Sequence, residues 1–380
     1  MISFLKDNAT NPPKIDEIEL TFFGPGFGES IVVFIPGIGW GIIDSCEFEV
    51  SGHKLVPPLE YLISQKVNEI EFLVLTHPHA DHFKGMEQII RQYLGKINRI
   101  CRYQGDSIRE LTAHLFRKGI KGSSGATSAK ALAAVFEAFE EAAKFGAEKR
   151  RLGALTQVIP HQKVSVNGQE FAVEVLSLSP LAEDEEKYTN ILMDAFPQEK
   201  MELKEISDHK HNMIASAIRI SVGNVVVILG SDVEKGVNAS SGWRGIVNSA
   251  DAPDLCVKTL KVPHHGSPGA YYHKAWAEHC KNGKIISVIT PFNKGSHPRP
   301  TENDIERVGN YSKLVGLTSH IRFKRPVDVY NRALARRLPK KWKVVQTSKE
   351  SGFLSVRYDL AGNKTFHTAR QPAEWIKKFG

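Results

Sequence analysis

The feature of this sequence that most constrains its fold is the run HPHADH at residues 77–82, which directly follows an apolar segment at 71–75. The apolar segment has the length and composition of a buried strand. A loop at a strand end can direct several side chains to one place while the sheet holds the backbone still. Because imidazole and carboxylate groups are ligands that suit zinc, manganese or iron, the run predicts a metal site.

Alternation of side chains along the run divides its ligands between two ions. His77 and His79 are expected to hold one ion, and Asp81 and His82 a second. Two adjacent cations lower the pKa of a shared water from ~15.7 towards ~7 and stabilise negative charge in a transition state. We therefore expect two divalent metal ions, Zn²⁺ or Mn²⁺, as cofactors, with Asp81 also acting in catalysis by orienting the hydroxide.

Two later segments carry further candidates for the same site. Asp232 follows an apolar strand predicted at 225–229, where its carboxylate can bridge two cations. His264 and His265 follow a strand predicted at 255–262, and adjacent side chains point in different directions. We expect only one of these two histidines to bind a metal ion directly, which leaves the other to contact substrate or to transfer a proton.

These motifs resemble those of the metallo-β-lactamase superfamily of hydrolases. The segment Thr76 to His82, followed by Gly85, is similar to the superfamily signature, and the other landmarks follow in the expected order. The LKVPHHGS segment at 260–267, the GSD at 230–232, the turn at 28–30 and the Ser-His-Pro at 296–298 are similar to ComEC-like competence proteins. That branch contains a presumed nuclease domain. The resemblance covers roughly residues 18–305.

The resemblance implies roles for several residues. It makes Asp44 a support of the ligand loop, Asp232 the bridging ligand and His265 the usual last ligand, so His264 is assigned a catalytic role. It also places His297 near the mouth of the site. A phosphate contact or a general-acid role is one interpretation of His297, and a loop histidine without a role is the other.

Many members of the superfamily carry one more histidine ligand between the first cluster and the bridging aspartate. His209 and His211 are the candidates in this chain, but ComEC-like members often lack this ligand. We therefore expect His211 to lie on a surface loop, with metal ligation as the alternative.

The predicted elements favour an α/β fold. Strands followed by helices in both halves indicate an αββα sandwich of two mixed β-sheets flanked by helices, which is the metallo-β-lactamase fold, with a helical insertion at about 106–155. We expect residues 1–325 to form the hydrolase domain, and residues 326–380 to add a basic segment and closing strands to it. Strands are predicted at 17–23, 30–35, 40–43, 71–75, 164–166, 171–178, 216–221, 225–229, 255–262, 284–289, 342–347 and 353–359, and helices at 57–65, 85–93, 106–118, 128–145, 271–281 and 301–309. The Asn167-Gly168 pair predicts a tight hairpin.

The charge balance favours anionic partners. The formal net charge is +8, which suits nucleic acid or a phosphorylated substrate. A basic segment near the C-terminus could neutralise phosphates and stack bases, although a solvated helix face explains it equally well. This basic segment contains Lys324, Arg325, Arg332, Arg336, Arg337, Lys340, Lys341 and Lys343, with Tyr330 and Trp342 among them.

No membrane association is expected. The N-terminus lacks the basic and apolar regions of a signal peptide, and the longest apolar stretch, 30–44, is broken by Pro36 and three glycines. The four cysteines form no CxxC pair, so we expect reduced thiols in a cytoplasmic protein.

Together these patterns predict a metal-dependent hydrolase, and most specifically a phosphodiesterase or nuclease that acts on DNA or RNA. One alternative is a hydrolase of a small ester, thioester, lactam or cyclic nucleotide, because the same metal core serves all of these reactions. Another is a non-catalytic, partner-binding component of a larger assembly such as a defence system, with the helical insertion as the surface for a protein partner.

Overall fold

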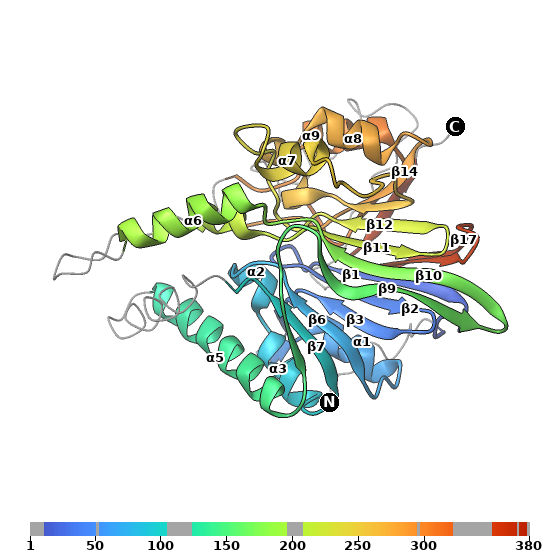
Figure 1. The fold of residues 1–380 in the computed structure, drawn as a ribbon, viewed down its shortest axis with the longest axis horizontal. Helices are drawn as coiled ribbons and strands as arrows, with labels where there is room; N and C mark the ends of the chain where they lie inside the picture. The colour runs from blue at the N-terminus through green and yellow to red at the C-terminus, as the bar shows by residue number, and fades with distance from the viewer. Residues whose placement is uncertain are drawn as a thin grey trace.

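Two eight-stranded mixed sheets pack face to face, and helices cover their outer faces (Figure 1). The structure is a computed structural model that describes residues 11–50, 53–104, 124–195, 208–294, 297–321, 352–370 and 372–377. The predicted α/β class and the αββα sandwich of two mixed sheets are confirmed.

The first sheet has the strand order β17-β16-β1-β2-β3-β6-β7-β8. Its strands β3, β6, β7 and β8 run parallel, and the others pair antiparallel. Their bounds are β1 (Glu17–Phe23), β2 (Ser30–Ile35), β3 (Gly39–Ile43), β6 (Ile70–Leu75), β7 (Ile97–Arg102), β8 (Glu148–Arg151), β16 (Phe353–Asp359) and β17 (Lys364–Arg370). A separate two-stranded ribbon contains β4 (Phe48–Val50) and β5 (His53–Leu55).

The second sheet has the order β18-β15-β14-β13-β12-β11-β10-β9. Here β12, β13, β14 and β15 run parallel. The bounds are β9 (Thr156–Val166), β10 (Gln169–Ser177), β11 (Ile218–Val222), β12 (Val225–Leu229), β13 (Thr259–Lys261), β14 (Ile285–Ile289), β15 (Ser312–Leu317) and β18 (Glu374–Lys377). The parallel strands of both sheets matter for the site, because their carboxyl ends carry its side chains.

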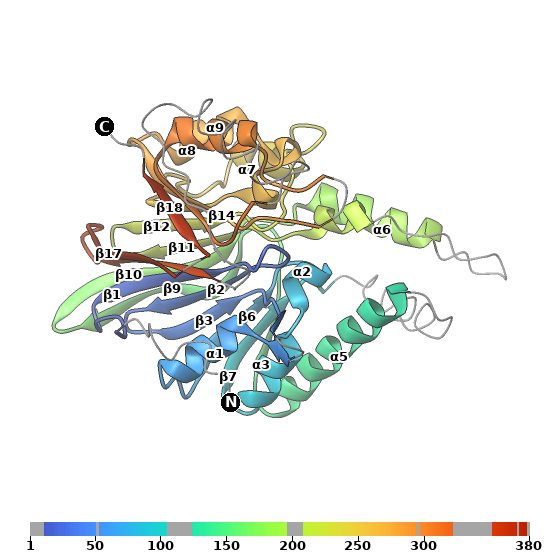
Figure 2. The ribbon, with the colours of Figure 1, turned by 180° about the vertical axis from the view of Figure 1, so that it is seen from behind.

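The helices divide between the two outer faces (Figures 1 and 2). The first sheet is covered by α1 (Pro57–Ser64), α3 (Met86–Gln92) and α5 (Ser124–Lys144), and the second by α7 (Gly242–Asn248), α8 (His273–His279) and α9 (Glu302–Tyr311). One apolar layer lies between each sheet and its helices, and a third lies between the two sheets. Leu20 and Phe22 of β1 contribute to this third layer from one side, and Val227 of β12 contributes from the other. Burial of these three layers stabilises the sandwich.

The region expected as a helical insertion, about 106–155, contributes to the first sheet. Among its described residues, α5 leads from β7 to β8, and these two strands pair in parallel. A parallel pair needs a crossover of this kind, usually a helix. The Asn167-Gly168 hairpin is confirmed: both residues have positive φ, 53° and 77°, as a tight turn between β9 and β10 requires.

Some predictions fall on residues outside the described part of the chain. These are the helix at 106–118, the strand at 342–347 and the basic segment with Lys324, Arg325, Arg332, Arg336, Arg337, Lys340, Lys341, Lys343, Tyr330 and Trp342. All four cysteines are described, and none forms a disulfide. Among the described helices, none combines the length and the apolar character that a bilayer crossing demands.

Candidate metal centre

The HPHADH run changes from strand to helix within six residues. Strand β6 ends at Leu75, and the short helix α2 (Ala80–Phe83) begins two residues after Pro78. Asp81 and His82 therefore project from a helical turn, whereas His77 lies in the bend at residues 77–78 before it. The division of the ligands comes from this change of backbone conformation, which corrects the expectation of alternation along a strand.

One group of donor atoms gathers around His77. Its Nε2 lies 2.8 Å from Nδ1 of His79 and 3.9 Å from Oδ2 of Asp232. Ligand atoms of these three residues all lie within 4.8 Å of one another. For comparison, the edge of a tetrahedron around an ion with ~2.0 Å bonds is about 3.3 Å. The spacing suits one divalent ion.

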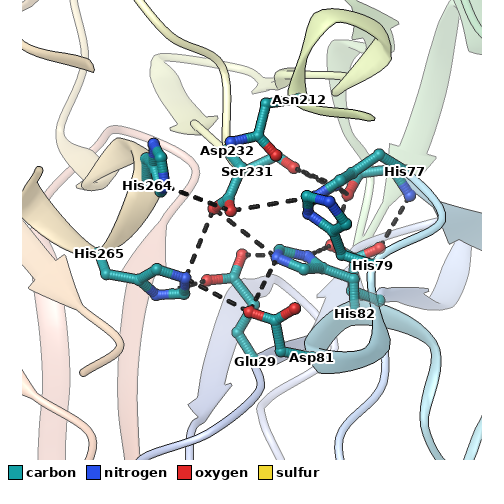
Figure 3. A network of polar contacts seen from close by, with 12 residues as sticks. Glu29, His77, His79, Asp81, His82, Asn212, Ser231, Asp232, His264 and His265 are labelled. Atoms are coloured by element: carbon teal, nitrogen blue, oxygen red, sulfur yellow. Dashed lines mark hydrogen bonds and ion pairs between the residues drawn. The ribbon is translucent and has the colours of Figure 1, made fainter. Parts of the chain in front are cut away.

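A second group faces the other oxygen of Asp232. Oδ1 of Asp232 lies 3.7 Å from Nε2 of His82 and 3.7 Å from Nε2 of His265. Oδ2 of Asp81 lies 3.5 Å from Nε2 of His265 and 3.8 Å from Nε2 of His82. Figure 3 shows the Asp232 carboxylate between the two groups, with His77 on one side and His265 on the other. The structure thus brings five of the predicted metal ligands together around the carboxylate of the sixth, Asp232.

Buried polar atoms without hydrogen-bond partners show that this cluster fits metal ions. Nε2 of His82, Oδ1 of Asp232 and Oε1 of Glu29 are all buried and lack a hydrogen-bond partner. Such atoms normally cost about 1–3 kcal/mol each. A cation coordinated between these atoms would remove that cost, and the nitrogen and oxygen donors match zinc, manganese or iron.

The charges of the site lead to the same conclusion. Four carboxylates are buried here, those of Glu29, Asp44, Asp81 and Asp232, against the single buried ammonium of Lys261. Buried charges require compensation, and divalent cations supply it.

Hydrogen bonds on the far side of the imidazoles fix their orientation. Asp44 accepts from the backbone N of Thr76 at 2.8 Å, and its Oδ2 lies 2.7 Å from Nδ1 of His82. Nδ1 of His265 lies 2.8 Å from the carbonyl oxygen of Thr290. Both contacts turn the Nε2 atoms toward Asp232, as outer partners of metal-binding histidines commonly do. Asp44 thus has the position that the resemblance implied.

The backbone at the site is held in an unusual conformation. Seven described non-glycine residues have positive φ, and four of them are Asp44, Ser231, His264 and His265. This left-handed region is disfavoured for residues with a Cβ atom, and it concentrates where the surrounding structure imposes it for function. It allows His264 and His265 to direct adjacent imidazoles to different places.

Glu29 is a member of the site that the sequence analysis did not assign. Its Oε2 contacts Nζ of Lys261 and accepts a hydrogen bond of 2.6 Å from Oγ1 of Thr290. Its Oε1 lies 3.8 Å from Nδ1 of His82, and Glu29 belongs to the second group of candidate ligands. The signal was Lys261, which stands between the apolar residues Leu260 and Val262, because a buried ammonium needs a buried carboxylate.

The electrostatic field of the site keeps its carboxylates ionised. Burial acts to raise the pKa of Asp81, but the neighbouring His82 and His265 outweigh it and hold that pKa below its usual range. At Asp232 the effect of burial on the pKa is likewise outweighed, by His265, His264 and His82. Burial also lowers the pKa of His77, and nearby His82 lowers it further. His77 is therefore neutral and able to bind a metal ion through Nε2.

The two consecutive histidines differ in exposure. The side chain of His265 is 4% exposed and that of His264 is 27% exposed. Nε2 of His264 lies 4.0 Å from Oδ2 of Asp232, and its Nδ1 lies 3.6 Å from Oε1 of Glu234. His265 thus lies inside the cluster, and His264 lies at its rim.

The expectation of a surface-loop position for His211 is wrong. His211 is buried in a 3₁₀ segment, η1 (Asp208–Ile214). Its Nδ1 lies 2.7 Å from the hydroxyl of Tyr188, and its ring packs edge-on at 5.5 Å from the ring of His79. Tyr188 comes from α6 (Ala182–Ala195), a helix that the sequence patterns did not predict because its apolar residues are few. The side chain of His209 lies outside the described residues.

His297 is exposed on the loop between Phe292 and Arg299, two residues that form an isolated β-bridge. Phe292 itself packs on the ring of His265 at 5.2 Å. The loop therefore starts beside the cluster, but His297 belongs to neither group of candidate ligands.

Comparisons with known proteins add little to this geometry. No protein-family model and no curated protein matches the chain. Among solved structures, the chain is similar to the metallo-beta-lactamase fold protein YhfI from Bacillus subtilis, with 11% identity, a TM-score of 0.37, and coverage of 80% of this chain and 97% of that chain. A likeness at this level carries no conclusion about activity. The cluster itself suggests divalent metal binding and a metal-dependent hydrolase.

Proposed function

We propose that this protein is a phosphodiesterase that uses two divalent metal ions, zinc or manganese, and that its substrate is DNA or RNA. The observation that carries the proposal is the Asp232 carboxylate, whose two oxygens face separate groups of donor atoms. Paired ions of this kind serve phosphatases, polymerases and nucleases, where they stabilise the attacking and leaving oxygens of an in-line displacement.

The residues that would hold the ions fall into two sets joined by Asp232. His77 and His79 belong to one set, and Glu29, His82 and His265 to the other. Asp81 joins the second set through its contacts with His265 and His82. When bound, divalent ions at these positions supply Lewis-acid polarisation of a phosphoryl oxygen and a more acidic water.

The side chains around the sets have separate tasks in this proposal. Asp81 stays ionised and accepts a hydrogen bond from the attacking water, which orients that water towards phosphorus. His264, at the rim, donates a proton from Nε2 to the leaving oxygen. His297 is the alternative donor, because its loop begins beside His265.

Charge favours a phosphodiester over an uncharged substrate. The formal net charge of +8 attracts a polyanion, and the ComEC-like motifs resemble those of presumed nucleases. Hydrolysis of a small ester, thioester, lactam or cyclic nucleotide uses the same kind of centre and is the alternative that the experiment must distinguish. A non-catalytic, partner-binding role is the third possibility, and it predicts no turnover of any of these compounds.

The test is a substrate panel with manganese- and zinc-loaded protein. The panel contains single-stranded DNA, duplex DNA, RNA, bis(4-nitrophenyl) phosphate, 4-nitrophenyl acetate and a chromogenic lactam. An Asp81→Asn/His82→Ala variant is the inactive control. We expect cleavage of at least one nucleic acid by the wild type alone. Turnover of the acetate or the lactam without cleavage of any phosphodiester would contradict the proposal.

A further inference from the structure

Two lysines share one aromatic ring close to the candidate metal centre. Nζ of Lys294 lies 3.5 Å from the ring centroid of Phe27, and Nζ of Lys84 lies 5.3 Å from the same centroid. Phe27 comes from the turn between β1 and β2, Lys84 directly follows α2, and Lys294 follows β14. Three segments far apart in the sequence therefore converge on one half-buried ring, which holds the ammonium groups by cation–π attraction.

A continuous stack of rings connects the lysines to the metal centre. The ring of Phe27 packs at 5.5 Å from that of Phe292, and Phe292 packs at 5.2 Å from the imidazole of His265. His265 belongs to the second group of candidate ligands. The lysine pair thus stands at one side of that group.

Backbone hydrogen bonds hold the three segments together. The backbone N of Asn293 donates to the carbonyl oxygen of Gly26 at 2.6 Å, and the backbone N of Glu29 donates to the carbonyl oxygen of Asp81 at 2.9 Å. A side chain at Gly28 would approach the backbone of Asp81 to 3.1 Å, so the turn also needs a glycine here. The segments that carry the two lysines and Phe27 are therefore held in fixed positions relative to one another.

The charges of the two lysines are not balanced within the described part of the chain. Neither Lys84 nor Lys294 forms an ion pair with a described residue. Partial burial lowers the pKa of Lys294, and the nearby ammonium of Lys84 lowers it further, while Asp81 and Glu47 act in the opposite direction. Two like charges brought this close repel each other, and an anion bound between them would relieve the repulsion.

We propose that Lys84 and Lys294 bind a second anionic group of the substrate, a phosphate that neighbours the phosphodiester at the metal centre. This inference rests on the proposed phosphodiesterase function and narrows its substrate. A nucleic acid or a phosphorylated dinucleotide supplies that second phosphate, whereas a simple ester, a lactam or a cyclic mononucleotide does not. The pair therefore selects polyanionic substrates over small ones.

Three dinucleotides with a single internal phosphodiester test the inference with the metal-loaded, full-length protein. One is thymidylyl-thymidine without a terminal phosphate, and the others carry a 5′-phosphate or a 3′-phosphate. We expect the wild type to show a KM about tenfold lower for one of the phosphorylated forms, because a charge-assisted contact contributes roughly this factor. In a Lys84→Ala/Lys294→Ala variant, this advantage should disappear while kcat changes little.

A matched control is the Lys163→Ala/Lys274→Ala variant, which removes two exposed lysines from β9 and α8. It should keep the preference for the terminal phosphate. Equal kcat/KM for all three dinucleotides in the wild type would overturn the inference and leave the proposed function intact. So would a preference that survives in the Lys84→Ala/Lys294→Ala variant.

If the wild type cleaves neither a dinucleotide nor any nucleic acid of the substrate panel, the proposed function fails. Calorimetric binding of the same three dinucleotides then tests the lysine pair. Tighter binding of a phosphorylated form that is lost only in the Lys84→Ala/Lys294→Ala variant supports the pair as an anion site. Equal binding of all three compounds overturns it.

Discussion

Oδ2 of Asp44 lies 2.7 Å from Nδ1 of His82, on the side of the imidazole that faces away from the candidate ions. The same carboxylate accepts hydrogen bonds from the backbone N and the hydroxyl of Thr76. One buried residue therefore orients a candidate ligand and also fixes the strand end that carries the histidine loop. Figure 3 shows how closely His82 then approaches Asp232.

An Asp44→Asn substitution should weaken metal binding by about 10–100-fold, because a neutral amide holds the imidazole less firmly and lowers its basicity. Competition with a chromogenic chelator measures the affinity. The Asp251→Asn variant changes an exposed aspartate and serves as the control. Unchanged affinity in the Asp44→Asn variant would show that Asp44 does not act on the ligands.

Removal of metal should lower thermal stability. The buried carboxylates of the site repel one another, and three of the buried polar atoms lack partners. Ions that bind the folded chain alone stabilise it by about 2.7 kcal/mol at a free concentration of 100 times Kd. A chelator should therefore shift the unfolding midpoint downward in the wild type. In the Asp81→Asn/His82→Ala variant the chelator should have much less effect, and an equal shift in both proteins would contradict this explanation.

Removing only one partner of the ion pair between Lys261 and Glu29 should lower the free energy of unfolding strongly. Both side chains are fully buried, and burial acts to raise the pKa of Glu29 while Lys261 outweighs it and lowers that pKa. A Lys261→Met substitution leaves a buried carboxylate without its cation and should cost about 3–5 kcal/mol of unfolding free energy. The Lys261→Met/Glu29→Gln double variant should lose less than the single one. Urea unfolding of chelator-treated protein at pH 7 compares them, and a double variant less stable than the single one would refute the pairing.

His279, outside the site, should make stability depend on pH. Burial lowers its pKa to about 4, against the opposing effect of the hydrogen bond to the carbonyl of Leu255. The folded state therefore favours the neutral imidazole, and the stabilisation is complete above the unfolded pKa of about 6.5. It is lost as the pH falls towards 4, because the unfolded chain binds a proton that the folded chain does not.

Between pH 7 and pH 5 the contribution of His279 amounts to about 2 kcal/mol. A His279→Gln variant should lose this part of the pH dependence. Urea titrations of both proteins at the two pH values provide the comparison. Identical pH dependence in the wild type and the variant would mean that His279 does not titrate as its burial requires.

The parts of the fold that the sequence predicted are those with strong local signals. The alternating residues of Glu17–Phe23, the apolar run at 225–229 and the Asn167-Gly168 turn each determine their own element. The sequence patterns did not predict strands such as β8 (Glu148–Arg151), because this segment is short and charged and becomes a strand only by pairing with its neighbour β7. Tertiary context decides such segments.

The residues of the site likewise divide into those with a local sequence signal and those placed by long-range packing. Candidate ligands that are close together in the chain, such as His77 and Asp81, were visible as a motif. Asp232 and the pair His264 and His265 followed from their strand ends, and the resemblance favoured His265 of that pair. The places of Glu29 and His211 depend on long-range packing against Lys261 and Tyr188, which no local pattern encodes. The exposed position of His297 is likewise a property of the folded loop.

The most direct test of the two-ion centre is anomalous X-ray diffraction from crystals of the zinc-loaded protein, with data collected on both sides of the zinc absorption edge. The account predicts two anomalous peaks, one between His77, His79 and Oδ2 of Asp232, and one between Oδ1 of Asp232 and the side chains of Asp81, His82 and His265. Crystals grown at saturating zinc that show no peak on either side of the Asp232 carboxylate would contradict it.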